Sequence, residues 1–123
     1  MDAPLLICAA VEEELAGLLP ALRRAGPTWT GRVGEVDAAA RAIGIGPVEA
    51  ALGATEALRP APAAAIFLGT CGVFPGAAPA IGSVVVVDRA VLASAEAAAG
   101  LAYQPERMER FAQGDVRVAA ALA

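Results

Sequence analysis

The feature that most constrains the fold is an apolar run that passes directly into a loop of small residues, at residues 63–76. Residues 63–68 show no polar alternation, which is typical of a strand buried on both faces. Gly69 and Gly72 then allow a sharp turn and a close approach of backbone to a ligand. Ligands of open α/β sheets bind just beyond the carboxyl ends of strands. The loop is therefore a candidate binding loop, and a plain turn between two strands is the alternative.

Composition narrows the class of protein. With 123 residues the chain has the length of one domain, and we predict a single domain over residues 1–123. The net charge is −4 and the chain has no basic stripe, which argues against a nucleic acid partner. No apolar run reaches the roughly 18 residues of a membrane span, and no basic leader opens the chain. We therefore expect a cytoplasmic protein with no membrane partner.

The two cysteines, Cys8 and Cys71, both lie in apolar runs. We predict reduced, buried thiols rather than a disulfide framework. A reactive thiol at Cys71 is the less favoured alternative, because the chain has no histidine to activate it. We expect neither a metal site nor a cofactor.

Apolar periodicity predicts the order strand, helix, hairpin, helix, strand, strand. The corresponding ranges are 4–10, 11–24, 28–33 with 36–43, 48–58, 66–69 and 84–87. This order indicates an α/β fold with a mixed central sheet flanked by helices, in which residues 66–69 and 84–87 are the central strands. Farther along, residues 93–99 are predicted as helix or loop, 105–111 as helix, and 115–123 as strand or helix.

Three loops at strand ends are expected to converge on a ligand site, at residues 11–14, 44–46 and 70–72. Four segments around them carry a family resemblance: AAVEEEL at 9–15, GIGPVEAA at 44–51, LGTCGV at 68–73 and IGSVVVVD at 81–88. In this order and spacing they resemble the purine nucleoside phosphorylases and nucleosidases. The closest branch resembles the methylthioadenosine/S-adenosylhomocysteine nucleosidases and the futalosine hydrolases. The resemblance implies the N-terminal half of the nucleoside phosphorylase fold.

The resemblance also implies roles for individual residues. Phosphorylases carry an Arg-containing phosphate loop near the first segment, and no Arg precedes Arg23 here, so water is the expected nucleophile. Glu14 is implied as the catalytic carboxylate that positions or deprotonates this water. The implied substrate-binding residues are Val11 and Ile45 beside the ribose, Thr70 at the water or ribose, and Cys71 and Gly72 through their backbone. A solvated helix turn is the alternative for the three glutamates, and we retain it for Glu12 and Glu13.

The departures from the family pattern bear on activity. Family members are roughly double this length, and their second half carries a Met-Glu-x-Glu segment and an Asp that protonates the purine. This chain has neither, and Asp88 and Asp115 have different surroundings. Glycosidic cleavage needs leaving-group protonation as well as water activation. We therefore expect a truncated, impaired nucleosidase-like protein, with a non-catalytic remnant that binds a nucleoside or a protein partner as the alternative.

Half of a family sheet would leave an unpaired strand edge and an apolar face. We therefore expect a homo-oligomer, namely a dimer. The tail at residues 105–123 is the alternative cover for that face.

Overall fold

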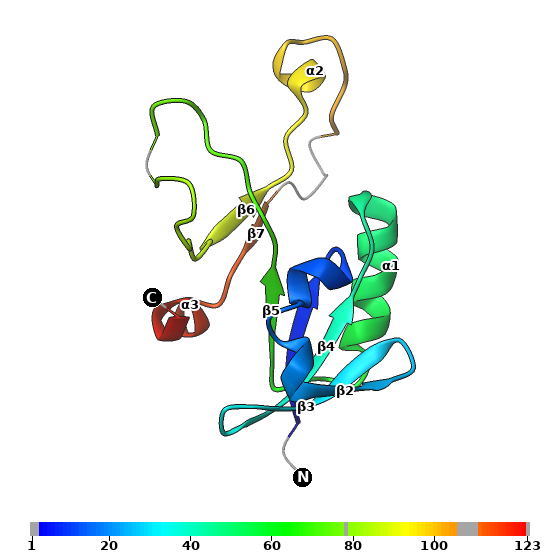
Figure 1. Cartoon of the computed structure of the whole chain (residues 1–123). Coiled ribbons are helices and arrows are strands. Elements are labelled where there is room, and N and C mark those ends of the chain that lie inside the picture. The colour runs from blue at the N-terminus through cyan, green and yellow to red at the C-terminus, as the bar shows by residue number, and fades with distance from the viewer. Residues whose placement is uncertain (1–2, 78, 106–110, 123) are drawn as a thin grey trace. The chain divides into compact units, whose positions relative to one another are not determined.

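The computed structural model describes residues 3–77, 79–105 and 111–122 (Figure 1). The chain falls into two compact units, Met1–Gly72 and Val73–Ala123. The first contains a five-stranded sheet and the second a two-stranded sheet. Every buried residue in the described part of the chain belongs to the first unit.

The sheet of the first unit has the strand order β2-β3-β4-β1-β5 (Figure 1). The strands are β1 (Leu5–Ala9), β2 (Leu22–Ala25), β3 (Thr28–Val33), β4 (Val36–Ala42) and β5 (Ala64–Leu68). β1 is parallel to its neighbours β4 and β5, whereas β3 is antiparallel to its neighbours β2 and β4. This mixed sheet with flanking helices confirms the predicted α/β class. Ala9 pairs with both Ala42 and Leu68, so the three parallel strands end at the same level.

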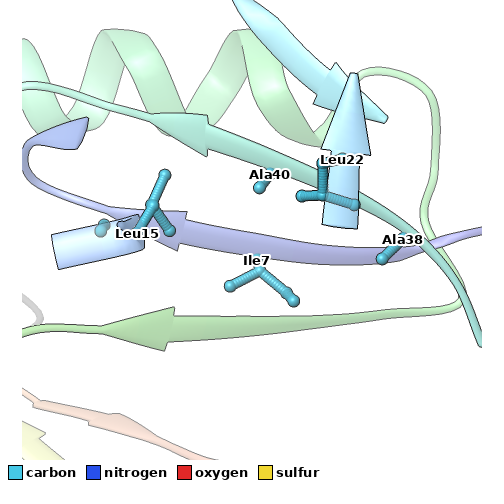
Figure 2. Close-up of a cluster of buried hydrophobic side chains, with 6 residues drawn as sticks. Ile7, Leu15, Leu22, Ala38 and Ala40 are labelled. Carbon is cyan, nitrogen blue, oxygen red and sulfur yellow. The ribbon is translucent and has the colours of Figure 1, made fainter. Parts of the chain in front are cut away.

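The core lies on both faces of β1, because successive side chains of a strand point to opposite faces. Ile7 and Ala9 belong to one apolar cluster, which Leu15 and Leu22 complete. Figure 2 shows this cluster around Ile7, Leu15, Leu22, Ala38 and Ala40. The other face of β1 is covered by helix α1 (Gly46–Leu58), whose Ala57 packs with Leu6 and Cys8. This burial of Cys8 confirms one of the two cysteine predictions.

Helix α1 packs closely because it carries small residues at the contact. Pro47 lies in its first turn, where the missing N–H of proline costs nothing. Gly53 faces the chain just after β4, and a Cβ at Gly53 would come within 2.1 Å of the Ile43 carbonyl oxygen. Only glycine therefore allows α1 to lie this close to the end of β4. The helix predicted at 48–58 is confirmed with a slightly earlier start.

The single helix predicted at residues 11–24 is wrong. The chain forms two short 3₁₀ turns, η1 (Glu12–Leu15) and η2 (Leu19–Ala21), and then enters β2. Pro20 stands at the start of η2, and a proline interrupts a helix anywhere beyond its first turn. The leucines of this segment still face the core. Leu15 and Leu22 are buried in one cluster, and Leu18 packs against it.

The two runs predicted as central strands end up elsewhere. Residues 66–69 fall mainly within β5, but β5 lies at the edge of the sheet, and Phe67 is 57% exposed. Residues 83–87 belong to no strand, and Val84 is 94% exposed. The prediction of 84–87 as a central strand is therefore wrong. The preference of β-branched residues for strands reflects packing against paired neighbours. Residues 84–87 pair with no strand among the described residues. β4 is the middle strand of the sheet instead, and β1 lies between β4 and β5.

The second unit has little regular structure. β6 (Arg89–Val91) pairs antiparallel with β7 (Phe111–Gln113). Helix α2 (Ala95–Ala98) begins at Ser94, whose hydroxyl oxygen accepts a hydrogen bond from the Ala97 N–H at 3.3 Å. Residues Val116–Leu122 form helix α3, so the helix is the correct one of the two alternatives, strand or helix, predicted for the tail. Most of the helix predicted at 105–111 lies outside the described residues. None of the described helices is long and apolar enough to span a membrane.

Candidate functional site

Three loops meet where the parallel strands end. The chain after β4 stays beside the chain after β1: the Ile43 N–H donates to the Ala9 carbonyl at 2.9 Å, and the Gly44 N–H to the Ala10 carbonyl at 3.1 Å. The loop after β5 begins opposite Ala9. The structure thus brings together the three loops that the sequence placed at strand ends.

Glu14 connects two of these strand ends through its carboxylate. Its Oε2 accepts hydrogen bonds from the Ala10 N–H at 3.0 Å and the Val11 N–H at 3.4 Å, and its Oε1 accepts one from the Thr70 N–H at 3.2 Å. The side chain is half-buried. A carboxylate offers about four acceptor positions. The three backbone donors leave roughly one position for a ligand or a water molecule.

The turn η1 explains why Glu14 points back to the end of β1. The Glu14 N–H donates to the Val11 carbonyl at 3.3 Å, which closes the first tight turn after the strand. Leu15 follows with no exposed surface and anchors the turn in the core. Gly69 lies so close that a Cβ there would be 3.6 Å from Glu14 Oε1. Local chain geometry and core packing together place this carboxylate between β1 and β5.

The two preceding glutamates differ from Glu14. Glu12 pairs with the Arg24 guanidinium at 3.2 Å, and this guanidinium lies over the Trp29 ring, 5.3 Å from its centroid. Glu13 is exposed. Exposed ion pairs contribute at most about 1 kcal/mol, so Glu12 and Glu13 form a solvated surface at this turn. Sequence reasoning missed the Arg24–Trp29 contact, because it depends on the register of β2 and β3.

The loop after β4 is shaped by Glu49, which sequence reasoning also missed. The Glu49 carboxylate accepts a hydrogen bond from the Ile45 N–H at 3.3 Å. Gly44 adopts φ +101°, and a Cβ there would lie 2.7 Å from the Glu49 Cβ. The position of Glu49 in the first turn of α1 is the sequence feature that could have indicated this contact. The Ile45 side chain is 69% exposed and available to a ligand.

The remaining predicted site residues lie on the loop after β5 and at the end of β1. Thr70, Cys71 and Gly72 are exposed, and Val11 is half-buried. The prediction that Cys71 is buried is wrong, because β5 ends at Leu68 and the loop leaves the sheet.

Burial does raise the pKa of the Cys8 thiol above its ordinary value, and the positive charge of Arg41 partly offsets this effect.

Other candidate sites in the described residues are poor. No group of three or more His, Cys, Asp or Glu side chains is arranged to hold a metal ion in the described part of the chain. A hollow of about 470 Å³ in the second unit is lined mainly by alanine and other apolar residues near α2. None of the predicted site residues lines it, so the strand ends of the first unit remain the candidate site.

Level strand ends, small-residue loops and a half-buried carboxylate define an α/β protein with a candidate ligand site at the carboxyl edge of its parallel strands. Residues 6–121 match the family described as the Phosphorylase superfamily. The chain belongs to this superfamily, a family of nucleoside-processing proteins. No curated protein matched the chain.

Proposed function

We propose that this chain is a nucleosidase-like protein that binds a purine nucleoside at the ends of β4, β1 and β5. The observation that carries the proposal is the Glu14 carboxylate between the ends of β1 and β5. Superfamily membership supports a nucleoside as the ligand. The four sequence motifs support the branch of methylthioadenosine/S-adenosylhomocysteine nucleosidases and futalosine hydrolases, in which water attacks the glycosidic bond.

In this proposal Glu14 positions the attacking water. Its three backbone hydrogen bonds hold the carboxylate in one orientation, and the remaining acceptor position is available to the water. A carboxylate fixed in this way contributes mainly orientation, which is a large part of catalysis between two reactants. The Thr70 hydroxyl holds the water or the ribose. Val11 and Ile45 pack against the sugar, and the backbone of Cys71 and Gly72 contacts the base and ribose.

We propose further that hydrolysis by this chain is impaired, because Asp37 and Asp115 are poor leaving-group acids. Asp37 lies near the amino end of β4, away from the carboxyl ends of the strands where the candidate site lies. Its carboxylate is 3.5 Å from the Arg32 guanidinium. The hydrogen bonds from Arg117 hold the pKa of Asp115 well below its ordinary value. A carboxyl with a lowered pKa is ionised at neutral pH and has no proton to donate. Without a proton donor, glycosidic cleavage loses orders of magnitude in rate.

The proposal is tested by measuring binding and turnover separately. Calorimetry with methylthioadenosine, S-adenosylhomocysteine and futalosine tests binding, and chromatography of the released base tests hydrolysis. We expect binding without turnover at the ordinary enzymatic rate of about 1–100 per second. Glu14→Gln is compared with Glu13→Gln, because Glu13 is an exposed neighbour with the same charge.

The outcomes separate the two functions that remain. Failure of all three nucleosides to bind would contradict the nucleoside site. Ordinary turnover would contradict the impairment, and loss of that turnover with unchanged nucleoside binding in Glu14→Gln but not Glu13→Gln would then assign Glu14 to the water. Binding with no detectable hydrolysis would favour the second candidate, a non-catalytic remnant that binds a nucleoside. The observation that favours this candidate is that neither Asp37 nor Asp115 is a suitable acid.

A further inference from the structure

The loop after β5 has few contacts that fix its position. The paired residues of β1 and β5 end at Ala9 and Leu68. Within the described residues, Thr70, Cys71 and Gly72 take part in no backbone–backbone hydrogen bond. The bond from the Thr70 N–H to Glu14 Oε1 is the one hydrogen bond shown for this loop, and it joins residues 56 positions apart. The loop that carries three predicted ligand contacts is therefore held by a single side chain.

We propose that Glu14 is a positioning residue that holds the loop after β5 against the end of β1, through its bridge from the Ala10 N–H to the Thr70 N–H. One oxygen of the carboxylate is anchored at the end of β1, and the other receives the loop. Loss of the bridge frees the backbone of Cys71 and Gly72 from its position beside the other strand ends. This inference rests on contacts alone, so it stands whether or not the chain hydrolyses a nucleoside.

The chemistry of the bridge requires a carboxylate. Both oxygens of an ionised carboxylate accept hydrogen bonds, so one side chain can serve N–H donors on two sides. Hydrogen bonds to an ionised group are also roughly twice as strong as neutral ones. A glutamine of the same shape has one oxygen and one NH₂ group, so one of the two strand ends would face a donor instead of an acceptor. Glu14→Gln therefore removes half of the bridge with little change in volume.

The test follows the backbone amides of the ¹⁵N-labelled full chain by nuclear magnetic resonance. In the natural sequence we expect the Ala10, Val11 and Thr70 amide hydrogens to exchange slowly, because each N–H donates to the Glu14 carboxylate. In Glu14→Gln, exchange of the amide hydrogen of Thr70 or of Ala10 rises about threefold to tenfold, the effect of losing one hydrogen bond at whichever strand end faces the glutamine NH₂ group. Glu13→Gln is the matched control, because no hydrogen bond is shown for the Glu13 side chain and the two variants have the same net charge.

The Cys8 thiol reports whether the variant remains folded, since Cys8 has no exposed surface in the folded chain. If Cys8 stays unreactive and the Ala10 and Thr70 amides each exchange equally fast in both glutamine variants, the proposal is overturned. If Glu14→Gln unfolds and Cys8 reacts, amide exchange in the natural sequence decides. A Thr70 amide that exchanges more slowly than in the unfolded chain supports the bridge, and a Thr70 amide that exchanges at the unfolded rate refutes it.

Discussion

Replacement of Gly53 by alanine tests how closely α1 packs on the sheet. A Cβ at this position would lie 2.1 Å from the Ile43 carbonyl oxygen and 2.7 Å from both the carbonyl carbon and the Cα of Ile43. All three are backbone atoms, which cannot rotate away as the end of a side chain can. The helix must therefore move away from β4, and the contacts of Ala57 with Leu6 and Cys8 loosen with it.

Two opposing free-energy terms give the expected magnitude. Alanine is favoured over glycine inside a helix by up to about 1 kcal/mol. Overpacking of a close contact costs about 1–3 kcal/mol, and the backbone clash at Gly53 places this variant at the upper end. The expected net effect of Gly53→Ala is a loss of about 1–2 kcal/mol in the free energy of unfolding.

The assay is urea denaturation of Gly53→Ala and of the natural sequence, monitored by circular dichroism. Gly17→Ala is the matched control, because a Cβ at Gly17 would meet nothing within 4 Å. We expect the control to be neutral or slightly stabilising, since alanine restricts the unfolded chain more than glycine does. A Gly53→Ala chain that gains about 1 kcal/mol, as helix propensity alone predicts, would refute the reasoning from packing.

Three further predictions follow from burial and exposure. Leu15→Ala should cost about 2–5 kcal/mol in unfolding free energy, because Leu15 has no exposed surface, whereas Leu52→Ala at a 64% exposed site should cost under about 0.5 kcal/mol. Burial raises the pKa of Cys8, so the unfolded chain loses this proton first and stability falls as pH rises above about 8.5; Cys8→Ala should flatten that slope in urea titrations. We also propose a homodimer, because β5 has a free edge among the described strands and Val48 and Phe67 are exposed; a monodisperse monomer in light scattering at tens of micromolar would contradict it.

Local patterns in the sequence were enough to predict the elements with short-range causes. The hairpin of β3 and β4 follows from two runs that were predicted as strands on either side of Gly34, which adopts φ +60° at the turn. The start of α1 follows from Pro47, whose fixed backbone angle suits a first helical turn. These outcomes depend on backbone angles and on neighbours a few residues away, which the sequence displays directly.

Local patterns failed where position in the sheet depends on distant partners. The runs at 66–69 and 84–87 are both apolar, yet one lies mainly in an edge strand and the other pairs with no strand among the described residues. Apolar content measures the tendency to be buried, but it does not specify which neighbour supplies the hydrogen bonds. Pro20 interrupts the first predicted helix locally, but the entry of the chain into β2 depends on the pairing of Leu22 with Gly31.

In the candidate site, too, some features could be predicted from the sequence and others depend on the tertiary structure. The sequence by itself determined which residue types stand at the three strand ends: a carboxylate at Glu14 and small residues in the loops after β4 and β5. Only the tertiary structure decided that the Glu14 carboxylate bonds the Thr70 N–H, 56 residues away. That contact exists because β1 and β5 pair side by side and end at one level. The pairing of distant strands is a property of the whole sheet, and no local stretch of the sequence contains it.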